Sequence, residues 1–258
     1  MLLRRLFAGA AAGAALLAGV GCSGGTAEGV AADLSKDNFA AELSDATTQQ
    51  HSTHLEGEVS FQGQTMTMSG DLTIAQELAD VEAQLEMQVP TQGVLEMRIV
   101  DSVFYMRGAG LSTESGKPWA RIDMSDPTNP LAGFYSQLMS YTNPVDQTEM
   151  FRAVTDLENK GEESVDGVDT THYEITVELR KALKETGLYE DLGAKAAGIA
   201  SELPEDVTHD VWVATDTALI VRMSVDLAGA SLDMHFSDWG EDVSVEAPPA
   251  SQVSDLDF

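Results

Sequence analysis

The chain has 258 residues and carries 14 Lys and Arg against 43 Asp and Glu, a formal net charge of −29. This charge repels phosphate, so it argues against electrostatic binding to nucleic acid or to an anionic membrane surface. The single cysteine excludes an intrachain disulfide and any CxxC redox or zinc motif. The length and an apolar fraction of 43% suit one large folded domain or two small ones.

Residues 1–21 have the pattern of a secretory signal peptide. Arg4 and Arg5 precede an apolar run, Leu6–Val20, whose 15 residues are too few to span a bilayer as a helix. The run ends at Gly19-Val20-Gly21-Cys22, which is similar to a bacterial lipobox with Gly19 where a leucine is usual. We predict that Cys22 carries a diacylglyceryl anchor and holds the protein on the extracytoplasmic side of the cell membrane. The alternative is an ordinary cleavage site beside a chance cysteine.

The mature chain is predicted to contain three segments. Residues 22–34 are the lipidated N-terminus and a flexible tether, because they contain Gly, Ala and Ser without apolar periodicity. Residues 35–247 are a lipid-binding domain, and residues 248–258 are an extended acidic tail. The domain begins with a helix that Ser35 caps and that extends to Gln50. Its buried stripe is Phe39, Leu43 and Ala46, which are spaced i, i+4, i+7.

After this helix the periodicity changes from that of a helix to that of a strand. The clearest stretch is Ala79–Val89, in which six apolar residues alternate with five acidic or amide residues. Because successive strand residues point to opposite faces, the stretch predicts a strand with one apolar and one acidic face. Similar alternation predicts strands at 55–61, 66–74, 95–99 and 103–107. The short turns between them indicate an antiparallel meander.

The second half of the chain mixes strands with helical segments. Strands are predicted at 119–123, 154–165, 168–177, 207–214, 219–227 and 230–239, and helices at 131–141, 146–154 and 178–200. Asn143-Pro144 separates the first two helices, and Asp166-Gly167 is a strong signal for a hairpin turn. The expected fold is therefore α+β, a single curved antiparallel sheet of about 10–11 strands that forms a half-barrel clasping helices. A two-sheet sandwich is the competing architecture.

The sequence contains no motif that indicates catalysis or metal binding. His51 and His54 are three residues apart without a third ligand nearby, and His172, His209 and His235 are isolated. Gly110–Lys117 superficially resembles a phosphate loop, but its spacing is wrong and Pro118 stands where Ser or Thr would bind magnesium. There is also no GxSxG nucleophile elbow. We therefore predict a protein that is not an enzyme and that has no cofactor and no metal site.

The eleven methionines are the most informative residues for function. Methionine is flexible and fills irregular space, which suits a surface that accommodates varied acyl chains, although the same residues could simply pack a core. Under the first interpretation, the apolar positions of the meander are the candidate ligand-binding residues. They are Met66, Met68, Leu72, Ile74, Val81, Leu85, Met87, Leu95, Met97, Ile99, Phe104 and Met106.

Several short stretches resemble the mycobacterial and actinobacterial lipoprotein family that includes LppX, LprA, LprF and LprG. These stretches are Gly19–Cys22, Trp119–Asp123, Asp166–Tyr173, Asp210–Val213, and Ser237–Gly240 followed by Ala247–Pro249. The resemblance covers essentially the whole mature chain. It implies a fold related to the LolA and LolB lipoprotein carriers, with an apolar cavity between the sheet and the helices.

The resemblance also implies a function. Family members bind or carry envelope lipids and lipoglycans, so the expected partners are a lipid with long acyl chains, the membrane through the N-terminal anchor, and a membrane transporter, with no nucleic acid. Two alternatives stay open. One is an extracytoplasmic sensor or accessory binding module, and the other is a structural envelope lipoprotein with a filled core.

Overall fold

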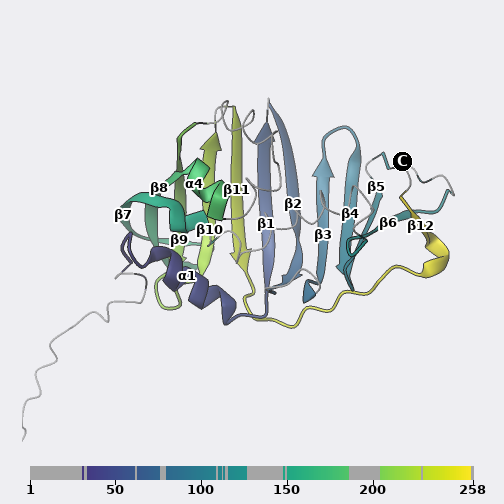
Figure 1. The fold of residues 1–258 in the computed structure, drawn as a ribbon, viewed down its shortest axis with the longest axis horizontal. Helices are drawn as coiled ribbons and strands as arrows, with labels where there is room; N and C mark the ends of the chain where they lie inside the picture. The colour runs from purple at the N-terminus through teal and green to yellow at the C-terminus, as the bar shows by residue number, and fades with distance from the viewer. Residues whose placement is uncertain are drawn as a thin grey trace, which may run out of the picture.

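The residues that the structure describes form one open, curved sheet with helices against one face (Figure 1). A computed structural model of the chain describes residues 31, 34–61, 63–75, 80–108, 110–111, 113, 116–126, 148, 150–185, 204–227 and 229–256. Within them the sheet has twelve strands in the order β12-β6-β5-β4-β3-β2-β1-β11-β10-β9-β8-β7. A single hydrogen-bonded sheet confirms the predicted half-barrel and excludes the two-sheet sandwich.

The strands follow the predicted alternation closely, and most neighbours along the chain pair as antiparallel hairpins. Their bounds are β1 Ser52–Phe61, β2 Gln64–Thr73, β3 Ala83–Val89, β4 Gly93–Val100, β5 Val103–Gly108, β6 Trp119–Asp123, β7 Val154–Val165, β8 Val168–Glu178, β9 Asp206–Ala214, β10 Ile220–Leu227, β11 Ala230–Ser237 and β12 Val253–Asp255. The predicted turn between β7 and β8 is present, with Asp166 at φ 53° and Gly167 at φ 84°. Positive φ at both positions is what a two-residue hairpin of this twist requires.

The strand predicted at Ala79–Val89 is shorter in the structure. β3 begins at Ala83, and Ala79 lies outside the described residues. Asp80 is in a short 3-10 turn, and the hydroxyl of Thr73 accepts a hydrogen bond from the backbone N–H of Glu82 at 2.8 Å. The backbone N–H of Thr73 still donates to the carbonyl of Glu82 at 2.8 Å, but the return bond goes to the Thr73 hydroxyl instead of its carbonyl, and alternation alone does not reveal this.

The first helix is also shorter than predicted. α1 spans Phe39–Thr48, and its N-cap position is Asn38 instead of Ser35. The backbone N–H and the hydroxyl of Ser35 both donate to Oδ1 of Asn38, at 2.7 and 2.9 Å. These two residues close a turn that precedes the helix. Phe39 and Leu43 are buried as predicted, and Ala46 packs partly buried against the core.

α1, a 3-10 helix η3 at Phe151–Ala153 and α4 at Leu179–Glu185 lie together over the β7–β10 end of the sheet (Figure 1). The ring of Phe39 packs edge-on against the rings of Phe151 and Tyr173, with centroids 5.4 and 5.6 Å apart. The helix predicted at 131–141 lies outside the described residues, as does most of the helix predicted at 178–200. Most of the helix predicted at 146–154 is described, and there the structure has the short 3-10 helix Phe151–Ala153 and the start of β7 at Val154. No helix in the described part of the chain is both long and apolar enough to cross a membrane.

The C-terminal segment adds a strand that the sequence pattern did not reveal. After β11 the chain runs along the lower edge of the sheet, passes a 3-10 turn η4 at Ala250–Gln252, and ends beside β6 (Figure 1). There β12 pairs with β6 in parallel, and Arg121 Nε donates to Oδ1 of Asp255 at 2.6 Å. This hydrogen bond and the charge of Asp255 raise the pKa of Arg121. The predicted tail therefore supplies the twelfth strand, and three residues are too few to show alternation.

Candidate functional site

The register of the sheet separates two faces of opposite chemistry. Residues directly opposite each other on antiparallel strands share a face, so each register line defines a row across the sheet. On the eight adjacent strands from β8 to β4, one row contains Tyr173, Val211, Met223, Met234, Gly57, Met68, Met87 and Leu95. We call the face that carries this row the inner face, because Tyr173 lies against α1. The opposite face is the outer face.

The inner face is apolar and is closed at one end. The row nearest that end is Leu72, Ala83, Ile99, Phe104 and Ile122, and each of these side chains is at most 3% exposed. Toward the tips of the β1–β2 and β3–β4 hairpins the same face becomes accessible. Met66, Met68, Met87 and Leu95 are half-buried, and Phe61 at a hairpin tip is 52% exposed. We call this the open end.

The structure brings the predicted ligand-binding residues together. Ten of the twelve lie on the inner face of β2 to β5, whereas Ile74 and Val81 flank the ends of β2 and β3 and are half-buried. Leu72, Leu85, Met97, Ile99, Phe104 and Met106 are buried, and the remaining four are half-buried. Whether any of them contacts a ligand stays a prediction.

The same face continues over residues that the sequence analysis did not assign to the site. Val59, Leu232 and Val225 extend it across β1, β11 and β10, all half-buried. The alternation of apolar and polar residues in β1, β10 and β11 already indicated that these three side chains lie on the apolar face of their own strands. The sequence could not show that β11 pairs with β1 and so joins the two halves of the face.

Two glycines sit on the inner face at the middle of the sheet. Gly57 on β1 lies opposite Met68 and Met234, and a Cβ added there would meet its nearest atoms at 3.8 Å. Gly70 on β2 has φ +153°, and a Cβ there would lie 2.0 Å from the carbonyl oxygen of Gln84. Glycine inside a strand often marks close approach by a ligand or another backbone segment. Gly70 is required by the backbone, whereas at Gly57 a Cβ would fit at ordinary contact distance.

His209 is a polar residue of the inner face that the sequence analysis left isolated. It is 8% exposed, its ring lies edge-on to Phe151 at 6.4 Å, and its Nδ1 is buried without a hydrogen-bond partner. Burial lowers the pKa of His209 from 6.5 to about 4, and the nearby charge of Asp210 opposes this only partly. The imidazole is therefore neutral at pH 7. In the sequence, His209 is two residues from both Val207 and Val211, which indicates that it shares their apolar face of the strand.

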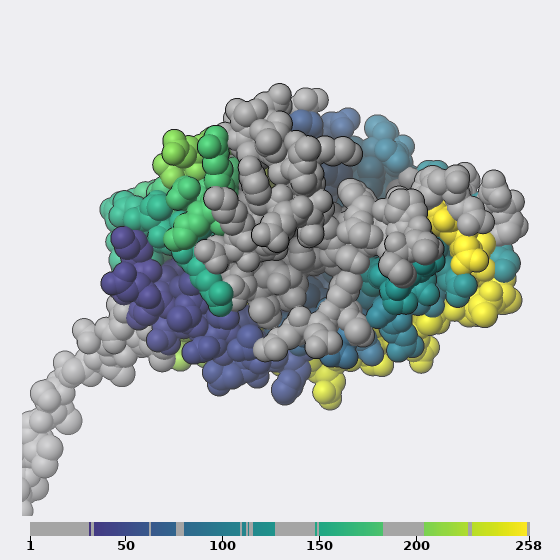
Figure 2. Space-filling view, in the orientation of Figure 1, coloured from purple at the N-terminus to yellow at the C-terminus, as the bar shows by residue number. Residues whose placement is uncertain are grey.

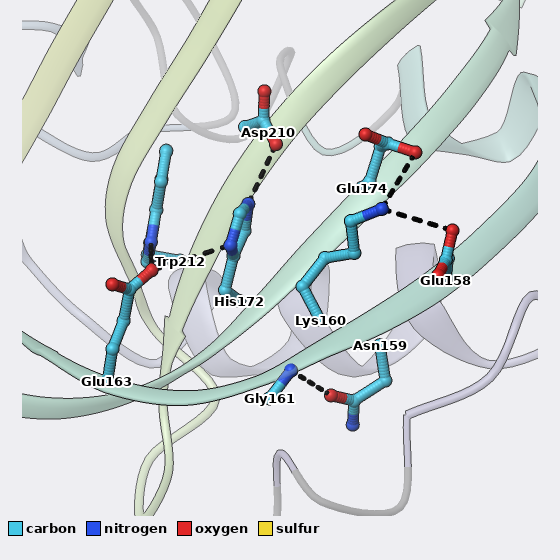
Figure 3. A network of polar contacts seen from close by, with 9 residues as sticks. All are labelled: Glu158, Asn159, Lys160, Gly161, Glu163, His172, Glu174, Asp210 and Trp212. Atoms are coloured by element: carbon cyan, nitrogen blue, oxygen red, sulfur yellow. Dashed lines mark hydrogen bonds and ion pairs between the residues drawn. The ribbon is translucent and has the colours of Figure 1, made fainter.

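The outer face carries charged and aromatic side chains that pair with one another. His172 stacks on Trp212 with centroids 4.4 Å apart, and its Nε2 lies 2.7 Å from Oδ1 of Asp210. Figure 3 shows this pair beside Lys160, which bridges Glu158 and Glu174 at 3.1 and 3.2 Å. These hydrogen bonds raise the pKa of Lys160. This face is a solvated shell of ion pairs.

A second group on the outer face surrounds Arg222. Its guanidinium lies over the ring of Trp212 at 4.5 Å and forms two hydrogen bonds to the carboxylate of Asp233. The bonds raise the pKa of Arg222 and lower that of Asp233.

The neighbouring strands of the outer face form a shallow groove of about 460 Å³. Acidic side chains line this groove, including Glu56, Glu58 and Glu86. No group of three or more His, Cys, Asp or Glu in the described residues could hold a metal ion.

An open curved sheet that places helices against an apolar face is a LolA-like fold. A family model for the LppX_LprAFG lipoproteins matches residues 36–245, so the chain belongs to the LppX_LprAFG lipoprotein family. This family consists of lipoproteins associated with the cell envelope.

Two curated relatives match parts of the chain. An uncharacterised 31.2 kDa protein of Streptomyces griseus is 27% identical over 200 residues, which are 73% of this chain and 65% of the relative. LppX of Mycobacterium tuberculosis, provisionally named a phthiocerol dimycocerosate transporter, is 33% identical over 100 residues, which are 38% of this chain and 37% of LppX. The matches thus span less than two thirds of either relative.

Two crystal structures share the fold. LprF of Mycobacterium bovis superposes with a TM-score of 0.54 at 17% identity, covering 83% of this chain and 96% of LprF. LppX of Mycobacterium tuberculosis superposes with the same TM-score at 22% identity, covering 82% of this chain and 100% of the LppX structure. At these identities the likeness shows the architecture alone.

Proposed function

We propose that this protein binds or transfers cell-envelope lipids with long acyl chains, and that it does so on the inner face of its sheet without catalysing a reaction. The observation that carries the proposal is the gradient of exposure along that face. A fully packed core would be sealed at both ends, but here the apolar rows pass from buried residues such as Ile99 to half-buried Met68 and exposed Phe61. The provisional transporter name of LppX agrees with this function.

Methionine is suited to such a face for a physical reason. Its unbranched side chain adapts its shape at little energetic cost, so Met68, Met87 and Met234 can pack against acyl chains of different shape. Gly57 lies among them and places no side chain at the centre of the row. Hydrocarbon surface buried there contributes about 0.8 kcal/mol for each methylene, so several methylenes already give measurable affinity.

We further propose that Cys22 anchors the domain near its closed end. Ala31 is fully buried, its N–H donates to the carbonyl of Thr215 at 3.1 Å, and its carbonyl accepts from the hydroxyl of Tyr173. Thr215 follows the end of β9 that lies on the closed side of the sheet. Nine residues from Cys22 to Ala31 span at most about 30 Å. The open end would then lie away from the anchored membrane, where a second membrane or a transporter could receive lipid.

The test compares leucine introduced on the two faces of the sheet. Full chains carrying Cys22→Ala are purified from the exported fraction, extracted with organic solvent, and analysed for bound lipid by mass spectrometry. Gly57→Leu fills space on the inner face, whereas Thr67→Leu adds the same side chain at an exposed position on the outer face.

We expect long-chain lipid with the parent chain and with Thr67→Leu, and at least tenfold less with Gly57→Leu. A parent chain that carries no lipid and binds none added to it would refute the proposal, and would favour a sensor or a structural lipoprotein. Cys22→Ala should also release the protein from the membrane fraction into the medium. Retention in the membrane would show that the anchor lies elsewhere.

A further inference from the structure

His209 is the polar member of an otherwise apolar row. The row crosses seven strands and contains Leu157, Ile175, His209, Val225, Leu232, Val59 and Met66. Val225, Leu232, Val59 and Met66 are half-buried and lead toward the open end, whereas Ile175 and His209 are buried. Leu157, on the edge strand β7, is half-buried again. His209 is therefore the first buried residue of the row on the path from the open end.

Three of the other four histidines have a carboxylate partner for the imidazole. His54, His172 and His235 lie on the outer face, each with a carboxylate oxygen 2.6 to 2.7 Å from a ring nitrogen. His209 has no such partner, although Asp210 follows it directly, because successive residues point to opposite faces. The difference between His209 and these three is therefore its place on the apolar face.

A buried polar atom without a partner is unfavourable. Leaving one unsatisfied typically costs about 1–3 kcal/mol, and in native proteins such atoms call for an explanation such as a bound water, ion or ligand. Ligand sites of apolar character usually contain a few polar groups that fix the orientation of the ligand. Nδ1 of His209 has the position and the free hydrogen-bonding capacity of such a group.

We propose that His209 is the polar attachment point of the bound lipid, hydrogen-bonding an uncharged oxygen of an acyl ester or a long-chain alcohol while the hydrocarbon follows the row toward Met66. This inference rests on the proposed function. Nδ1 donates to an ester carbonyl in one tautomer and accepts from a hydroxyl in the other. Both oxygens are neutral, so neither brings a charge into the apolar face.

The surroundings argue against a charged ligand group at this point. The described residues of the row supply no cation, and the neutral imidazole does not offset a carboxylate or a phosphate. Placing an unpaired anion there would require removing its hydration without compensation. A charged head group is therefore expected at the open end, in water, with the neutral oxygen at His209.

The test measures discrimination between ligands of equal length. Methyl hexadecanoate, heptadecan-1-ol and octadecane compete with a fluorescent acyl probe for the Cys22→Ala chain and for the same chain carrying His209→Leu, His209→Gln or His54→Leu. His54→Leu removes an outer-face histidine and serves as the control. Thermal unfolding confirms that each variant is folded.

The parent chain should bind at least one oxygen-bearing ligand about tenfold tighter than octadecane, a difference of about 1.4 kcal/mol. His209→Leu should abolish that preference without changing the affinity for octadecane. His209→Gln and His54→Leu should keep the preference for the oxygen-bearing ligand within a few-fold of the parent chain. An unchanged preference in His209→Leu, or an equal loss for all ligands, overturns the inference and leaves lipid binding intact. Failure of the parent chain to bind any of the three ligands refutes the proposed function itself.

Discussion

The buried imidazole of His209 makes the stability of this protein depend on pH in a defined window. Unfolded, the side chain takes a proton near its ordinary pKa of 6.5, whereas in the fold the pKa is about 4. Between these values the unfolded state binds more protons, so the free energy of unfolding falls as the pH falls. Above pH 6.5 this group has no effect. By pH 4.5 the free energy of unfolding is lower by about 2.5 kcal/mol, because each pKa unit of difference between the folded and unfolded states is worth about 1.4 kcal/mol.

The measurement is urea unfolding followed by tryptophan fluorescence at several pH values from 7.5 to 4.5. His209→Leu is the comparison, because every other titrating group is common to both proteins and cancels in the difference between their pH dependences. We expect that difference to grow steadily as the pH falls below 6.5. Asp233, whose pKa is already below 3.8, does not contribute in this range. Parallel pH dependences for the two proteins would show that His209 is not held as a buried neutral group.

Three other experiments with substituted proteins test particular parts of the structure. Gly70→Ala should lower the free energy of unfolding by several kcal/mol, because its Cβ would overlap a backbone oxygen of β3. Gly57→Ala is the control: its Cβ meets only ordinary contacts, so it should change the free energy of unfolding by less than about 1 kcal/mol. Arg98→Ala removes a 2.8 Å hydrogen bond to the C-terminal segment, so proteases should cleave that segment faster in the folded protein. A double-mutant cycle of Arg222→Ala and Asp233→Ala should give a coupling of at most about 1 kcal/mol that weakens with salt, because the pair is partly exposed.

Each of these has an outcome that would count against the structure. Equal stability of Gly57→Ala and Gly70→Ala would mean that β2 and β3 are not in the stated register. Unchanged proteolysis of Arg98→Ala would mean that other contacts hold the C-terminal segment, such as the bond from Lys117 Nζ to the carbonyl of Val253. A coupling that salt leaves unchanged would place the Arg222–Asp233 pair out of contact with solvent.

Most of the sheet could be predicted from sequence because each strand has one apolar and one wet face. β6 and β7 have the predicted bounds, and Asp166-Gly167 forms the predicted turn. Alternation fails where another interaction determines the backbone. At the end of β2 the Thr73 hydroxyl accepts the hydrogen bond that the Thr73 carbonyl would otherwise accept, and β12 is too short to show a period.

The candidate site could be predicted only in part, for a different reason. Alternation assigns a residue to the apolar face of its own strand, but not to neighbours across the sheet. The meander of β2 to β5 could be assembled because its turns are short, so its ten inner-face residues were found together. The pairing of β1 with β11 joins segments about 180 residues apart, and no local pattern specifies it. That pairing brings Gly57 between Met68 and Met234.

The separation of charge between the two faces limits what the inner face can bind. On the outer face, two histidines and two arginines contact carboxylates, backbone carbonyls or tryptophan rings. They are His172, His235, Arg98 and Arg222. The acidic groove beside them is an outer-face feature as well. Among the described residues, the inner rows are mostly apolar, and their buried polar members, such as Thr53, Thr171 and the neutral imidazole of His209, carry no positive charge, so these rows offer no cation to an anionic group. If lipid binds there, its hydrocarbon and a neutral oxygen are the parts that the protein recognises, and selectivity among charged head groups must come from residues at the open end.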